Sequence, residues 1–273
     1  MSTHIRVRKF PKTFEDTQPN AVYQGSKLTS HYFNAMSLLF PEGERFFIRS
    51  VNKFANQITD PKLKEEIKAF AAQEVQHGKA HDDLNQNLEV WGYNIKPIEK
   101  NLKDLLKLAE ESLNRIHPAM GLSITSALEH FTATQSEWFL RNRDFLKGMD
   151  KTTEEITLWH SCEEIEHKHV AFDVQKQVDD SYVLRVAGMM IGNTMIWGVS
   201  FAGAVYLMSQ EKELTLPELA EDILSMVQNV GPLFLNSMKN FFDYFRPDFH
   251  PNDHDNLPLA EAYMAEYEKK KSA

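Results

Sequence analysis

Cysteine is the scarcest residue in the sequence, with Cys162 the only one among 273 residues. One thiol cannot build a disulfide framework, and it cannot supply the sulfur ligands of a structural zinc or iron–sulfur site. The basic N-terminal residues Arg6, Arg8 and Lys9 are not followed by the apolar run of a secretory signal. We therefore expect a cytoplasmic protein in a reducing setting.

Glycine and proline are also few, with 11 of each. No stretch shows the strong alternation of apolar and polar residues that marks a half-buried strand, and the nucleotide-binding glycine pattern is missing. Lys and Arg number 30 against 39 Asp and Glu, which gives a net charge of −9. This balance excludes a general nucleic-acid partner, because phosphates require a broad basic face. Together these absences favour an all-α fold.

Helix signals follow one another along the chain. Asp60 and Pro61 are an N-cap and a first-turn proline, and Gly92 ends the helix that they open. In the preceding helix we expect a break or kink at Pro41. The expected helices cover residues 25–58, 61–90, 102–113, 118–146 and, from a cap at 152 or 153, the stretch to 178.

Glutamate and histidine stand in these apolar helices at regular spacing. Two helices carry Glu-x-x-His, which places both side chains on one helix face. Each of them is preceded by a helix with a lone glutamate in an apolar setting, and one more histidine lies four residues before the last glutamate. In chain order the predicted metal ligands are Glu44, Glu74, His77, Glu129, His160, Glu164 and His167.

Metal binding explains why such costly groups occupy these helices. Two divalent cations neutralise four carboxylates, which would otherwise repel one another in a low-dielectric core. The order Glu, Glu-x-x-His, Glu, Glu-x-x-His is how ferritin-like dimetal bundles are built. Two iron ions are the predicted cofactor, and manganese or zinc are alternatives. His81 shares the face of Glu74 and is either an extra ligand or a hydrogen-bond partner of a ligand.

Neighbouring acidic residues compete for two of these positions. Glu163 and Glu166 are alternatives to Glu164, which alone lies on the stripe between the two histidines of its helix. Glu42 is an alternative to Glu44, although a solvated residue of the first helical turn explains Glu42 better.

Residues 186–208 carry no charge, and a bilayer core takes about 20 apolar residues. Gly188 and Gly192 have the spacing that lets helices approach closely. Both membrane contact and a buried or dimer-interface helix fit this stretch, and residues 216–245 form an amphipathic helix beside it. We expect an arm (1–24), a ferritin-like four-helix bundle (25–180), a C-terminal extension with these two helices (181–273), and a homodimer.

The residues around the predicted ligands also carry a resemblance. The stretches 73–81, 127–130, 159–168 and 244–251 resemble the ferritin-like family of predicted metal-dependent hydrolases. The order of ligands is similar to that of the di-iron oxygenases typified by p-aminobenzoate N-oxygenase, and this likeness implies the same seven ligands.

Two reactions suit such a centre. In the first, a di-ferrous pair takes electrons from an unidentified donor, reduces dioxygen and oxidises a small, hydrophobic organic substrate. In the second, the two metals activate water for hydrolysis. The bundle and its carboxylates favour the first reaction.

Overall fold

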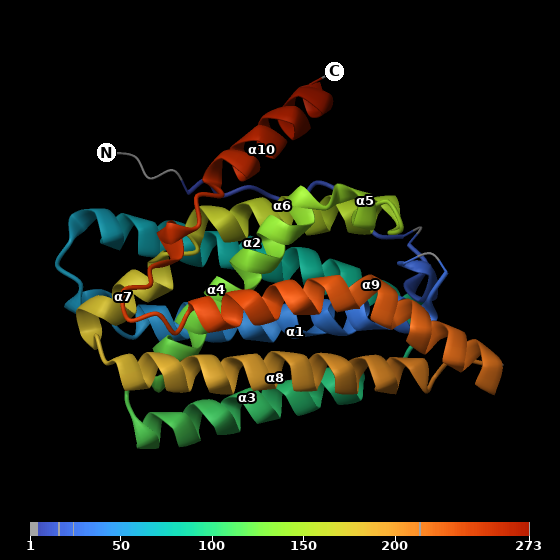
Figure 1. Ribbon diagram of the computed structural model, residues 1–273, viewed down its shortest axis with the longest axis horizontal. Helices are drawn as coiled ribbons and strands as arrows, with labels where there is room; N and C mark the ends of the chain where they lie inside the picture. Colours follow the sequence, from blue (N-terminus) through green and yellow to red (C-terminus); the bar gives the residue numbers. More distant parts are fainter. Residues whose placement is uncertain (1–4, 16, 24, 213, 273) are drawn as a thin grey trace.

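Helices account for nearly all regular structure in the computed structural model of the chain, which describes residues 5–15, 17–23, 25–212 and 214–272 (Figure 1). Residues 1–4, 16 and 24 of the expected arm lie outside this description. The described residues form no β-strand, only an isolated bridge between Tyr23 and Met149, so the predicted all-α fold is confirmed. The helices are η1 (Pro19–Ala21), α1 (Lys27–Asn52), η2 (Ala55–Gln57), α2 (Pro61–Val90), α3 (Lys96–Ile116), α4 (Met120–Arg141), α5 (Arg143–Leu146), α6 (Lys151–His167), α7 (Val170–Val178), α8 (Tyr182–Met208), α9 (Leu216–Asp243), η3 (Pro251–Asp253) and α10 (Leu257–Ser272).

Side-chain caps mark where several of the long helices begin. Ser26 accepts a hydrogen bond from the Thr29 amide at the start of α1. The cap of α6 is Asp150, not residue 152 or 153 as predicted, and it accepts from the Thr152 and Thr153 amides. Asp60 caps α2 as predicted, with Pro61 in the first turn. Each cap satisfies a backbone donor that has no partner within the helix.

The helix α1 runs through Pro41 to Asn52, so the break expected there does not occur. Proline has no N–H for the carbonyl four residues earlier, which here belongs to Ser37. The Asn85 side chain on α2 donates to that carbonyl oxygen at 3.2 Å. A bond between helices thus replaces the bond that Pro41 cannot make.

The last expected helix is two helices, because α6 ends at His167 and α7 begins at Val170. Lys168 and His169 at the junction are both buried. Lys168 Nζ donates to Asn256 Oδ1 at 2.6 Å, and His169 Nε2 lies 3.4 Å from Glu66 Oε2. The two side chains at the junction therefore bind different partners. No glycine or proline in the sequence indicates that the helix ends here. The helix expected over 118–146 is likewise divided into α4 and α5, and α3 is longer than the stretch 102–113.

The helix α8, which carries no charge from residue 186 to its end, packs one face against α1 and α4. An added Cβ at Gly188 would lie 2.6 Å from the Ser123 carbonyl oxygen of α4, and one at Gly203 would lie 2.9 Å from Ala35 Cβ of α1. Among the described residues, α8 is the one helix that is both long enough and apolar enough to span a membrane. Of its most apolar 18-residue stretch, 33% is buried. A core helix passes the same test, so α8 is compatible with a soluble or a membrane-associated protein.

The helices that carry the predicted ligands lie at the centre of the molecule. In Figure 1, α8 and α3 run along the lower edge, α9 crosses in front of α1, and α10 projects from the opposite side. One hydrophobic cluster joins α1, α2, α4, α7 and α8 through Phe47, Ile67, Leu122, Val174 and Leu184. This shared packing holds the helices in register around the candidate site.

Candidate metal centre

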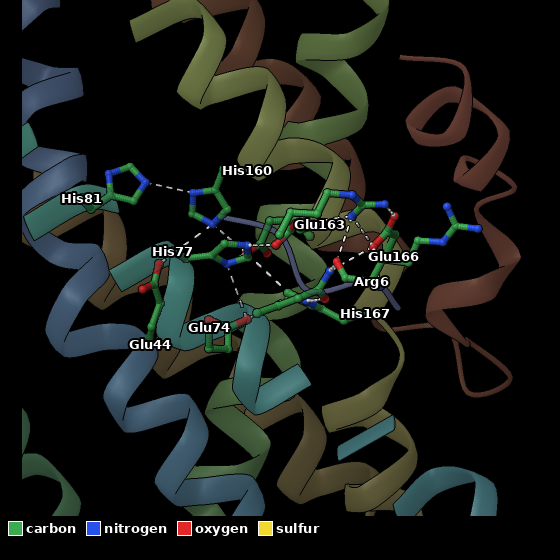
Figure 2. A network of polar contacts seen from close by, with 12 residues as sticks. Arg6, Glu44, Glu74, His77, His81, His160, Glu163, Glu166 and His167 are labelled. Carbon is green, nitrogen blue, oxygen red and sulfur yellow. Dashed lines mark hydrogen bonds and ion pairs between the residues drawn. The ribbon is translucent and has the colours of Figure 1, made fainter. Parts of the chain in front are cut away.

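The structure brings all seven predicted ligands together between α1, α2, α4 and α6, and every one is buried. Helical periodicity aims the members of each helix at the same point, as Figure 2 shows for most of them. Glu44 comes from α1, Glu74 and His77 from α2, Glu129 from α4, and His160, Glu164 and His167 from α6.

Their ligand atoms form three overlapping groups, each within 4.8 Å. Two of these groups share no residue, and the third joins them through Glu74 and His77. The arrangement therefore has the donors for two adjacent cations. The groups are Glu44 with His77 and His160; Glu74 with Glu129 and His167; and Glu74 with His77 and Glu164.

Distances at the centre suit shared coordination. Glu164 Oε1 lies 2.8 Å from His160 Nε2 and 3.6 Å from both His77 Nδ1 and His167 Nε2. His167 Nε2 also lies 3.1 Å from Glu74 Oε1 and 3.2 Å from Glu129 Oε2. Two ligands at right angles on one ion lie roughly 3 Å apart when each metal–ligand bond is about 2.1 Å.

Buried polar atoms without a hydrogen-bond partner gather here. Both carboxylate oxygens of Glu44, Glu74 and Glu129 have none, and neither do His77 Nδ1 and His167 Nε2. Leaving a buried donor or acceptor unsatisfied costs about 1–3 kcal/mol, and a charged one costs more. So many unsatisfied atoms at one point fit metal ligands, which is what carboxylate and imidazole groups in this number would hold.

The electrostatics show the same demand for positive charge. Burial raises the pKa of Glu44 well above its ordinary value, and the nearby carboxylates of Glu74 and Glu164 raise it further. Burial raises the pKa of Glu129 to about 7, although His167 opposes this. Burial disfavours the charged form of His167, yet the surrounding carboxylates raise its pKa well above the usual range. A pair of cations would relieve both effects.

Outer hydrogen bonds orient two of the histidines. His77 Nε2 lies 3.1 Å from Glu163 Oε2, so it donates to that carboxylate and leaves Nδ1 with a lone pair facing the centre. His167 Nδ1 lies 2.9 Å from Gln73 Oε1, an acceptor, so its Nε2 faces the centre with a lone pair. Partners of this kind fix the tautomer and orientation of a metal-binding imidazole.

Arg8 of the N-terminal segment connects the partners of these two histidines: it contacts Glu163 directly and Gln73 through Glu166. Arg8 Nη1 lies 3.3 Å from Glu163 Oε1, and Arg8 forms two bonds of 2.9 and 3.0 Å with Glu166. Gln73 Nε2 donates to Glu166 Oε2 at 2.9 Å. We call Arg8, Gln73, Glu163 and Glu166 the outer clamp; it connects the two imidazoles through a continuous chain of charged and polar groups. Figure 2 shows Glu163 and Glu166 beside the two histidines.

The third histidine is held by a relay that includes His81. Asn85 Nδ2 donates to the Ser37 carbonyl, so Asn85 Oδ1 accepts from the Ser37 hydroxyl at 2.8 Å. With its proton used, Ser37 Oγ accepts from His81 Nδ1 at 2.9 Å. His81 Nε2 then accepts from His160 Nδ1 at 2.9 Å, which leaves His160 Nε2 with a lone pair for the centre. His81 belongs to none of the three groups of ligand atoms.

Among the weighed alternatives, Glu163 and Glu166 lie in the outer clamp, not in the ligand groups. Glu42 pairs with Arg45 at 2.8 Å on the surface. Sequence reasoning missed Gln73 and Arg8 as partners of the site. Glu163 and Glu166 flank Glu164 in a helix with no exposed face over that turn, and this crowding of acids is the signal that could have pointed to a buried cation.

Two cavities reach the centre from different sides. One of about 90 Å³ is bordered by His160 and Glu164, and the other, of about 80 Å³, by Glu44. Phe40 and Thr132 border both. No lysine or arginine lines either cavity, so the described walls offer no cation to an anionic substrate.

Comparison with known proteins identifies one family. Its sequence model, described as predicted metal-dependent hydrolase, matches residues 6–255. No curated protein and no solved structure matches the chain.

Proposed function

Because the chain belongs to the family of predicted metal-dependent hydrolases, we propose that it is an enzyme with a dinuclear metal centre. The observation that carries this proposal is the convergence of four buried carboxylates and three imidazoles, most of whose inward atoms lack hydrogen-bond partners. Each imidazole is oriented by an outer partner, so the donors are prepared for metal and not merely crowded.

A ferritin-like arrangement is part of the proposal. One glutamate from each of α1 and α4, and Glu-x-x-His from each of α2 and α6, match the ligand plan of such bundles. The oxygen-rich donor set suits iron or manganese, and its four carboxylates balance two divalent ions.

We propose oxidation of an organic substrate as the reaction. Two ferrous ions, when bound, would supply the electrons that reduce dioxygen. The seven ligands would hold these ions, the outer clamp and the His81 relay would keep the imidazoles in their metal-binding form, and the cavity walls would limit access of water. The cavity that borders Glu44 is lined mainly by apolar side chains, which supports a hydrophobic substrate and entry of dioxygen.

Hydrolysis by metal-activated water is the second candidate, and the description of the family favours it. The absence of lysine and arginine from the walls of both cavities supports an uncharged ester or amide over a phosphoester as its substrate.

One set of measurements separates the two reactions. Protein purified without added metal is analysed for its elements, reduced anaerobically and mixed with dioxygen, and the same preparation is tested on uncharged esters. We expect two iron ions per chain and dioxygen uptake that depends on them. Zinc with ester cleavage and no dioxygen uptake would replace oxidation by hydrolysis, and a chain that binds no metal would end the proposal.

A further inference from the structure

The cavity that borders Glu44 lies between α1, α3, α4 and α8 and differs in chemistry from its neighbour. Its walls include Phe47 of α1, Leu106 of α3, Leu128 of α4 and Ile196 of α8. The cavity beside His160 is instead bordered by several hydroxyl and amide side chains. The cavity that borders Glu44 is thus the one lined almost entirely by hydrocarbon side chains.

Polar atoms are nearly missing from this apolar cavity. Glu44 and Thr132 are the polar side chains in its wall, and the Thr132 hydroxyl already donates to the Glu129 carbonyl at 3.1 Å. A charged or hydrogen-bonding group placed inside would find no partner except the Glu44 carboxylate, and burying such a group unpaired costs several kcal/mol. The part of a ligand that enters must therefore be apolar.

The size of the cavity selects a narrow ligand. Its volume of about 80 Å³ is roughly half of the ~150 Å³ at which an apolar protein cavity accepts benzene. On the outer side, Leu105 and Leu108 of α3 are 43% and 63% exposed beside the wall residues Leu106 and Ala109. Exposed apolar side chains of α3 thus stand next in the chain to the wall of an apolar cavity that borders Glu44.

We propose that this cavity binds the alkyl chain of an uncharged substrate and places the end of that chain beside Glu44. The inference rests on the proposed function and gives its substrate class. The chain enters past α3, and the polar part of the substrate stays outside.

Linear alcohols from hexanol to dodecanol are the probes, with binding to the purified, metal-containing protein measured by calorimetry. Each buried methylene should tighten binding about fourfold, until the chain fills the cavity and the gain stops. Val199→Phe on α8 and, as a second blocking variant, Ala109→Phe on α3 should each shorten the chain at which the gain stops or abolish binding.

Thr194→Phe is the matched control, because it adds the same ring to an exposed position of α8. Ser136→Phe fills the other cavity instead. Circular dichroism and melting curves check that each variant is folded. The inference is supported if both controls bind like the parent and the blocking variants do not. Equal binding by all variants, or loss only in Ser136→Phe, would overturn it.

Metal analysis of the same samples keeps the two proposals apart. Two metal ions per chain without alkanol binding would overturn the alkyl site alone. Alkanol binding with the expected variant pattern in a chain that holds no metal would support the cavity assignment and overturn the proposed function.

Discussion

Removal of the Arg8 guanidinium is the sharpest perturbation of the outer clamp. The Arg8 side chain is 16% exposed, whereas those of Glu163 and Glu166 are 0% and 5% exposed. Arg8→Met keeps much of the apolar length and removes the charge, so two buried carboxylates lose their cation. Breaking a buried ion pair from one side costs about 3–5 kcal/mol, which should lower the melting temperature by at least roughly 5 °C.

The same change should weaken metal binding. Glu163 and Glu166 orient His77 and, through Gln73, His167, and loss of such outer partners typically costs 10- to 100-fold in metal affinity. Arg8→Lys should recover part of both losses, because lysine restores the charge but not the paired geometry.

Arg6→Met is the control for Arg8→Met. Arg6 reaches the same cluster through its backbone, with its N–H donating to Glu166 and its carbonyl accepting from Gln73. Its side chain is exposed and can be changed without breaking these bonds. Urea unfolding and elemental analysis are run on both variants. If Arg8→Met matches Arg6→Met in stability and metal content, the reasoning about the clamp is refuted.

Three further changes test other parts of the molecule. Glu129→Gln keeps the shape of the side chain but removes a charge from the centre, so purified protein should contain less metal and melt lower than the parent; unchanged metal content would remove Glu129 from the ligand set. Gly188→Ala forces a Cβ to within 2.6 Å of the Ser123 backbone and should destabilise the protein by about 1–3 kcal/mol. Gly198→Ala adds a Cβ that meets nothing within 4 Å and should stabilise the protein by about 0.5–1 kcal/mol. Urea midpoints measure both changes. Burial lowers the pKa of His31 although Glu211 opposes this, so His31 in the unfolded chain takes up a proton below about pH 6.5, at which His31 in the folded chain stays neutral. The free energy of unfolding should therefore fall on acidification below that pH. A His31→Gln variant whose urea midpoint fell as steeply would contradict this cause.

Spacing within a helix was enough to predict which side chains share the centre. The turn of 3.6 residues fixes that His160, Glu164 and His167 lie on one face, and the structure places them with glutamates from three other helices. Such a prediction needs no knowledge of how the helices pack, because costly groups on the inner face must converge or remain unpaired. Capping signals such as Asp60 are local for the same reason.

Interactions between helices were beyond that reasoning. Pro41 was expected to break or kink α1, and the Ser37 carbonyl that it leaves without a helical donor accepts instead from Asn85, 48 residues away. The division between α6 and α7 likewise depends on Asn256 and Glu66, which receive the side chains of Lys168 and His169. Neither partner is indicated by a local pattern.

Three glutamates near the end of α6, Glu163, Glu164 and Glu166, show how far reasoning from local spacing reaches. The stripe argument separated Glu164 from Glu163 and Glu166, and of the three only Glu164 falls in a group of possible ligand atoms. It implied nothing about the environment of the other two, and the structure buries all three. A helix turn with three buried acids requires cations on more than one side. The metal centre would supply one side, and Arg8 supplies the other from a segment with no helical period. Because that cation lies 155 residues from Glu163 in the chain, only the folded arrangement identifies it, and the N-terminal segment is thereby part of the site and not a loose extension of it.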